Sequence, residues 1–251
     1  MASEPSQAHM HPSTRDAAGF AATRWSMVLA AADQQPGAKS RRALEELARL
    51  YWYPLYAYIR RHGHDAPTAE DLTQEFFARL IEKQSLAAVD RSKGKFRSFL
   101  LASVKHFLAN EWDKQRAQKR GGGVRVIPLD AQEAESRYAV EPADDQTPER
   151  LFERRWALAV LDQVLLRLRA QYQAKGQTPL FEALKYRLTA GGGAPRYAEL
   201  AQELGMTPNA LMVASHRLRR QYREMLWQEI AQTVASPELI DDEIGYLMNC
   251  L

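Results

Sequence analysis

The segment from Phe96 to Arg120 most constrains the fold, because its apolar and charged residues separate onto two faces at the spacing of an α-helix. The apolar face holds Phe96, Phe99, Leu100, Val104, Phe107 and Leu108. The opposite face holds Lys105, Trp112, Arg116 and Lys119. An aromatic ring among cations suits phosphates and an unstacked base, so the pattern favours a nucleic-acid partner. A solvated charged helix with Trp112 packed against a neighbour explains the same pattern equally well.

Helical spacing recurs along the chain and no segment alternates like a strand, so the sequence predicts an all-α fold. Further helices are expected over 23–32, 44–59, 68–82, 149–174 and 179–188. Pro54 should kink its helix without ending it. Thr68 and Asp71 resemble an N-terminal capping arrangement for the next helix. His62 and His64 follow the helix that contains Pro54, and with no third ligand nearby they indicate a polar turn rather than a metal site.

Composition and glycine runs predict two helical domains with extensions. Residues 1–22 are polar and expected to be disordered, and the first domain covers 23–120, where three glycines follow. An acidic flexible linker is predicted over 121–148, a second domain over 149–233, and an acidic extension with a short amphipathic helix over 234–251. Charge is distributed in blocks along the sequence. Residues 95–120 include seven Lys and Arg and two acidic residues, and residues 129–149 include seven acidic residues and one Arg. Any nucleic-acid surface must therefore be local, since the whole chain of 251 residues carries a net charge of only +3.

Several classes of function are disfavoured by what the sequence lacks. Cys250 is the only cysteine, which excludes an internal disulfide and argues against a cysteine zinc site. No run approaches the roughly 20 apolar residues of a membrane span, and the first residues do not resemble a signal peptide. No nucleophile elbow, metal motif or paired catalytic carboxylates stand out. We therefore expect a cytoplasmic protein that is not an enzyme and that has no cofactor or metal.

Residues 197–216 have the pattern of a helix-turn-helix unit. Ala201 allows close helix approach, Gly205 suits the turn, and Leu211 and Ala214 point into the shared core. The outer face of the second helix and its flanks comprise Asn209, Met212, Val213, His216, Arg217, Arg219, Arg220 and Arg223. In a DNA-binding unit the early turns would face bases and the later arginines would contact phosphates.

The order of these parts resembles bacterial RNA polymerase sigma factors of the extracytoplasmic-function group. The runs that carry the resemblance are DLTQEFFARL at 71–80, FRSFL at 96–100, AELA at 198–201 and HRLR at 216–219. The resemblance implies a region 2-like bundle that binds the polymerase clamp helices and opens the minus ten element. It also implies a region 4-like domain that reads the minus thirty-five element and meets the polymerase flap, with a linker running toward the RNA exit path. Covalent chemistry would belong to the polymerase.

Transferred by position, the resemblance assigns three groups of residues. Polymerase binding falls to Asp71, Gln74 and Glu75, which are expected to form one outer polar patch. Melted minus ten DNA would contact Lys105, His106, Asn110, Trp112, Arg116 and Lys119, with a flipped base in the loop 86–94. Minus thirty-five DNA would contact Asn209, Met212, His216, Arg217, Arg219, Arg220 and Arg223.

Two departures from the family pattern and one alternative stay open. Met212, Val213 and Ala214 stand where the family often has Lys or Arg, so base readout could rest on fewer polar contacts and on DNA shape. The acids of the extension have no basic neighbours in sequence, and its helix could restrain the second domain or simply stabilise it. An anti-sigma factor is compatible with the family. The alternative function is a stand-alone helix-turn-helix repressor or activator, which should bind duplex DNA without polymerase.

Overall fold

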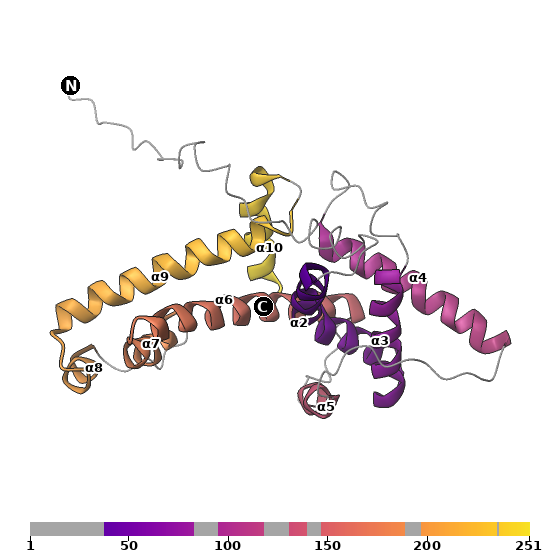
Figure 1. The fold of residues 1–251 in the computed structure, drawn as a ribbon, viewed down its shortest axis with the longest axis horizontal. Coiled ribbons are helices and arrows are strands. Elements are labelled where there is room, and N and C mark those ends of the chain that lie inside the picture. The colour runs from indigo at the N-terminus through magenta and orange to yellow at the C-terminus, as the bar shows by residue number, and fades with distance from the viewer. Residues whose placement is uncertain (1–37, 83–94, 118–130, 140–146, 189–196, 235) are drawn as a thin grey trace, which may run out of the picture.

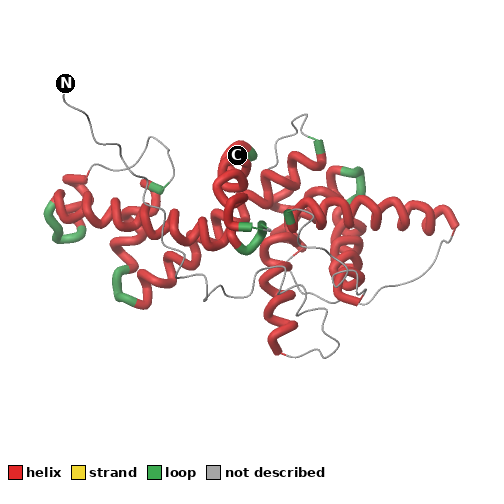
Figure 2. Tube along the Cα trace, turned by 90° about the horizontal axis from the view of Figure 1, so that it is seen from above, coloured by secondary structure: helices red, strands yellow, loops and turns green. Residues whose placement is uncertain are grey.

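The computed structural model describes residues 38–82, 95–117, 131–139, 147–188, 197–234 and 236–251. Within these ranges every regular element is a helix, which confirms the predicted all-α fold (Figure 2). None of these helices is long and apolar enough to cross a membrane. The predicted helix at 23–32, the loop 86–94 and the glycine runs at 121–123 and 191–193 lie outside the described residues.

Three helices form the N-terminal bundle: α2 (Ala38–Arg61), α3 (Ala66–Glu82) and α4 (Phe96–Ala117). Helix α2 continues through Pro54, as predicted. The predicted cap at Thr68 and Asp71 is wrong, because α3 begins two residues before Thr68. Instead the Thr68 backbone N–H donates to Asp65 Oδ1 at 3.0 Å, so Asp65 satisfies an amide of the first turn.

Two long helices, α6 (Pro148–Ala174) and α9 (Pro208–Ala231), lie side by side and connect the two ends of the molecule (Figure 1). Both begin in the same way. A threonine hydroxyl, from Thr147 or Thr207, accepts the backbone N–H three residues later, and a proline takes the first helical position, where no N–H is needed. The two sequences therefore define two sharp helix starts without help from tertiary contacts.

The larger hydrophobic core contains residues of α2, α3 and α4, of the first half of α6 and of the last turns of α9. Trp156 of α6 is fully buried in it and donates from Nε1 to the Tyr51 hydroxyl of α2 at 3.2 Å. Burying one large apolar side chain contributes about 1.5–3 kcal/mol. The second domain is predicted to begin at residue 149. The first half of α6, which follows this boundary, instead packs in the core of the N-terminal bundle. The division of the chain into domains stays a prediction.

A smaller core lies at the other end of α6 and α9. It is built with α7 (Thr178–Leu184), the short 3-10 helix η4 (Lys185–Arg187) and α8 (Tyr197–Glu203). Its buried members are Leu168, Tyr172, Phe181, Leu184, Leu200, Ala201, Leu211 and Leu218. Tyr222 and Met225 of α9 pack against both cores. The helix-turn-helix end is thus joined to the α2–α4 bundle by continuous packing along α6 and α9.

Helix α5 (Ala131–Ala139) lies within the predicted flexible linker, where no helix was expected. Tertiary contacts hold it on α2: Glu135 accepts from Arg60 Nε at 3.1 Å and Nη2 at 2.7 Å and from the Tyr56 hydroxyl at 2.5 Å, and Ala134 is buried. A nine-residue helix is too short to be stable alone in water, so these contacts explain its presence.

The predicted amphipathic helix of the extension is present as α10 (Ile240–Asn249), preceded by the 3-10 turn η5 (Pro237–Leu239). Ile240 and Leu247 are buried against the larger core, whereas Leu239 and Met248 are exposed. Helix α10 contacts α9 and α6. The idea that the acids of this extension lack basic partners is wrong for Glu243, which is fully buried and bonded to Lys95 and Arg97.

The described helices give the molecule an elongated shape (Figures 1 and 2). Helix α8 and the start of α9 lie at one end, and α4 projects from the opposite end. The two surfaces predicted to contact DNA therefore lie far apart on the molecule.

Candidate nucleic-acid interface

Helix α4 has the two faces that its sequence predicts. Phe96, Leu100, Val104, Phe107 and Leu108 are buried. On the outside lie Lys105, His106 and Asn110, and the Trp112 side chain is 60% exposed. Arg116 belongs to α4 but its side chain is not described, and Lys119 lies outside the described residues. The exposed tryptophan favours the surface interpretation of this face over packing against a neighbour.

A pocket of about 470 Å³ opens beside Trp112. Its walls come from the end of α2 and the turn after it, from α4 and from the start of α6. The lining residues are Tyr58, His62, His64, Lys105, Leu108, Ala109, Trp112 and Glu149. Aromatic rings next to a lysine could accept a flat base and its phosphate. The predicted polar turn at His62 and His64 thus forms part of the candidate interface, which no local sequence signal indicates.

Three ionisable groups around this pocket have shifted pKa values, and burial raises the pKa of Tyr58 to about 12. The Lys105 ammonium lies 2.8 Å from a Glu149 carboxylate oxygen, and this hydrogen bond lowers the pKa of Glu149 below its ordinary value, with burial opposing it. Burial lowers the pKa of His64, and the neighbouring His62 adds to the effect while Asp65 opposes it. The Glu149 carboxylate therefore binds the lysine that is predicted to contact DNA.

The basic cluster counted over 95–120 is smaller on the surface than in the sequence. Arg97 is only 4% exposed, and its guanidinium binds Glu243 while lying 4.1 Å from the Tyr246 ring centroid and 5.1 Å from that of Trp156. Lys95 also reaches Glu243, at 2.5 Å. Including Lys95 and Arg97 in a basic nucleic-acid surface is therefore wrong, because both bind Glu243 and hold α10 beside the start of α4.

Two of the three residues predicted to form an outer polar patch on α3 lie on its surface. Asp71 and Glu75 are exposed, and Glu75 pairs with Arg79, which also binds Glu111 at 2.8 Å. The expectation that Gln74 faces outward is wrong, since it is 6% exposed and donates from Nε2 to Glu70 Oε1 at 3.0 Å. Its position on the helix explains this: residues 70 and 77 flank it on the same side, and Phe77 is buried in the core. The polar patch therefore consists of Asp71 and Glu75.

The helix-turn-helix geometry is present in α8 and α9. Gly205 has a φ of +62°, the left-handed conformation that favours glycine, and ends α8. Ala201 and Leu211 are buried where the helices cross, and Ala214 packs against the same cluster. Tyr197 of α8 donates to Ser215 of α9 at 3.1 Å. These contacts fix the angle of α9, and with it the direction of its outer face.

All residues predicted for minus thirty-five contacts are exposed. They are Asn209, Met212, His216, Arg217, Arg219, Arg220 and Arg223. Val213 is exposed as well, at 53%. Arg220 pairs with Glu224 at 3.6 Å on the surface, whereas Arg219 donates to the Arg187 carbonyl at 3.2 Å and so leans toward η4. The group is thus a single basic surface with apolar Met212 and Val213 near its start.

Within the described ranges, no three or more His, Cys, Asp or Glu side chains form a group that could hold a metal ion. The described geometry is instead that of two exposed surfaces at opposite ends of a helical protein: one on α4 with Lys105 and Trp112, and an arginine-rich one on α9.

Comparison with known proteins finds a family match for the segment that contains the α4 surface. The model for sigma-70 region 2 matches residues 47–118, which run from α2 to the end of α4. The chain is also 24% identical to RNA polymerase sigma factor YlaC of Bacillus subtilis (strain 168) over 186 residues, which is 74% of this chain and 93% of that protein. Together, the two matches support a bacterial RNA polymerase sigma factor of the extracytoplasmic-function group. No solved structure matches it.

As an alternative sigma factor, the protein acts in transcription initiation with core RNA polymerase and promoter DNA. Sigma factors are regulatory proteins. The region 2 match covers α4 with Trp112 and Lys105 and also α3 with Asp71 and Glu75. These findings do not favour a stand-alone repressor or activator.

Proposed function

We propose that this sigma factor divides promoter recognition between its two ends. The α4 face captures the melted minus ten strand, and the outer face of α9 reads the minus thirty-five element. The observation that carries this proposal is the exposed Trp112 beside Lys105 and a pocket of about 470 Å³, inside the segment that matches sigma region 2. Stacking on an aromatic ring stabilises an unstacked base by about 1–3 kcal/mol, which offsets part of the cost of opening the duplex.

Capture of DNA at this face requires Lys105 to exchange partners. In the free protein Lys105 binds Glu149, at the start of α6. A phosphate of the melted strand is a stronger ligand than an exposed carboxylate, because it offers more acceptor oxygens and its counterions are released on binding. The exchange therefore favours DNA once the strand has been brought to α4 by the polymerase.

Polymerase attachment falls to the acidic surface of Asp71 and Glu75, which would meet the clamp helices of the largest subunit. The helix-turn-helix end would contact the flap. Exposed carboxylates on a rigid helix can form charge-assisted hydrogen bonds with a basic partner without any change in the fold. The sigma factor would supply recognition and positioning only, in the cytoplasm, while the polymerase performs phosphoryl transfer. An anti-sigma factor would compete for the same surfaces.

Strand opening tests the role of Trp112. Core polymerase is combined with the wild-type sigma factor, with Trp112→Ala or with Tyr186→Ala, and opening is followed with a promoter that carries a fluorescent base analogue in its minus ten element. Tyr186 is a matched control because its ring is 58% exposed on η4, outside region 2. We expect Trp112→Ala to reduce opening about tenfold, as the loss of one stacked base implies, with polymerase binding unchanged. Opening by Trp112→Ala at the wild-type level would contradict the proposal.

A further inference from the structure

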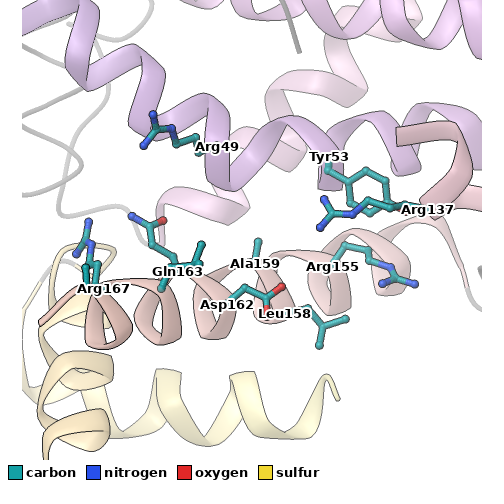
Figure 3. Close-up of a pocket in the computed structure, with 11 residues that line it drawn as sticks. Arg49, Tyr53, Arg137, Arg155, Leu158, Ala159, Asp162, Gln163 and Arg167 are labelled. Carbon is teal, nitrogen blue, oxygen red and sulfur yellow. The ribbon is translucent and has the colours of Figure 1, made fainter. Parts of the chain in front are cut away.

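A second pocket, of about 630 Å³, lies between α2 and α6 and takes no part in the predicted DNA or polymerase surfaces. Arg49 and Tyr53 of α2 face α6 across it, and Arg137 of α5 reaches in from one end (Figure 3). Its floor includes the apolar side chains Leu158 and Ala159 of α6. Both its volume and its mixture of an apolar floor with a few polar groups are typical of small-molecule sites.

Cationic side chains outnumber carboxylates in the lining of this groove. Four arginines line it, namely Arg49, Arg137, Arg155 and Arg167, against the single carboxylate of Asp162. Arg167 is held by Glu229 at 2.5 Å, and Arg137 lies 3.7 Å from Glu133. One acidic contact leaves most of the five N–H donors of a guanidinium for another ligand. These contacts therefore orient Arg167 and Arg137 and balance part of their charge, but they leave N–H donors for a ligand.

The polar groups are ordered along the groove. Figure 3 shows Arg49, Gln163 and Arg167 at one end, Tyr53, Arg137 and Arg155 at the other, and Asp162 between them. Arg155 and Arg167 are twelve residues apart on one helix, which places them about 18 Å apart along its axis. A single phosphate cannot reach both ends, so a ligand that uses the whole groove must be extended.

The two ends favour different parts of such a ligand. Arg137 and Arg155 lie over the Tyr53 ring, at 5.3 and 5.9 Å from its centroid. Guanidinium planes and tyrosine rings both stack on nucleobases. At the other end, Arg49 and Arg167 present the forked donors that bind phosphate oxygens. Asp162 would repel a phosphate between the ends but would accept a hydrogen bond from a ribose hydroxyl.

We propose that this groove binds a nucleoside polyphosphate. Its phosphates would lie at Arg49 and Arg167, its ribose at Asp162, and its base against Tyr53 and the two neighbouring arginines. A continuous chain of phosphates fits less well, because it would bring a negative charge to Asp162. Since α2 and α6 both line the groove, a bound nucleotide would hold these two helices together. The site is independent of the proposed promoter and polymerase contacts.

Calorimetric titration of the full-length protein, without polymerase, tests the site with four probes: ATP, GTP, inorganic tripolyphosphate and adenosine. We expect saturable 1:1 binding of ATP or GTP, at least tenfold tighter than either tripolyphosphate or adenosine. Arg49→Glu and Arg137→Glu should each weaken that binding at least tenfold. Both side chains are exposed, so the fold should persist, which circular dichroism checks. Lys175→Glu, an equal charge change on an exposed residue beyond the groove, should leave binding unchanged.

Three results would overturn the proposal. One is the absence of saturable nucleotide binding. A second is tripolyphosphate binding as tight as that of ATP and GTP, which would remove the roles of the base and ribose. The third is an equal loss of affinity in Lys175→Glu, which would mean general attraction to a basic protein. Because polymerase takes no part in this titration, each of these results would leave the promoter proposal untouched.

Discussion

Arg97 and Glu243 are 146 positions apart in the chain, yet they form a two-pronged ion pair inside the protein, with Nε to Oε1 at 2.8 Å and Nη2 to Oε2 at 3.2 Å. Glu243 is fully buried and Arg97 is 4% exposed. Lys95 binds the same carboxylate, and the Phe96 N–H donates to the Thr233 carbonyl at 3.3 Å. The acidic extension therefore joins the start of α4 to α6 and α9.

Removing one partner of this pair should destabilise the protein strongly. Glu243→Ala leaves the Arg97 guanidinium buried without its main counter-charge, which costs about 3–5 kcal/mol of the free energy of unfolding. Urea denaturation measures the loss. The neighbouring exposed residue gives the control, since Asp242→Ala should cost within about 0.5 kcal/mol. An equal, small effect of both changes would show that the pair does not hold α10.

The contact between Lys105 and Glu149 should oppose DNA binding. Glu149→Gln removes the carboxylate that occupies Lys105, so affinity for single-stranded DNA in the polymerase complex should rise severalfold at low salt. Stability should change by less than about 1 kcal/mol, because both side chains are at least a third exposed. Fluorescence anisotropy of a labelled minus ten strand checks the affinity. Unchanged affinity would place Lys105 outside the DNA path.

Docking of α5 should weaken in acid. Hydrogen bonding from Arg60 lowers the pKa of Glu135, with burial opposing it and Tyr56 adding to it. A carboxylate with a lowered folded-state pKa adds stability that is fully present above its ordinary value of 4.5 and is lost as pH falls through the lowered value. The difference in unfolding free energy between wild type and Glu135→Gln should therefore be constant near neutral pH and shrink below pH 4.5. A difference that stays constant into strong acid would contradict this role.

The arginines of α9 should carry much of the salt dependence of promoter binding. Replacing Arg217 and Arg220 by Ala should lower the slope of log affinity against log salt by about 0.9 for each lost phosphate contact. Both are exposed, so the fold should lose no more than about 0.5 kcal/mol per change. Promoter binding by the reconstituted polymerase at several salt concentrations gives the slope. The exposed Lys175→Ala is the control and should leave it unaltered.

The sequence predicted those features that depend on local pattern. The buried face of α4 follows from apolar residues at helical spacing, and the helix predicted over 149–174 is present as α6. The turn at Gly205 also follows from its residue type. Each of these features is decided within one helix or one turn, so one chain segment contains all the information.

Features that depend on distant partners were not predictable in the same way. The local charge pattern places Arg97 on the surface, whereas Glu243 and Tyr246 surround it in the structure. Helical spacing likewise predicts an exposed Gln74, which is buried. Helix α5 exists because Arg60 and Tyr56 bind Glu135. His62 and His64 join the Trp112 pocket only because the fold brings the turn after α2 to the same pocket as α4 and the start of α6. No periodicity in the sequence indicates these contacts between distant residues.

Retention of purified bacterial core RNA polymerase on the immobilised sigma factor tests whether the protein initiates transcription through core polymerase. Asp71→Lys with Glu75→Lys reverses the proposed polymerase surface, and Asp241→Lys with Asp242→Lys makes the same charge change on exposed residues of α10. We predict that the wild type and the α10 variant retain polymerase and that the α3 variant, still folded, does not. Failure of the wild-type protein to retain polymerase, together with tight binding to duplex DNA alone, would contradict the account.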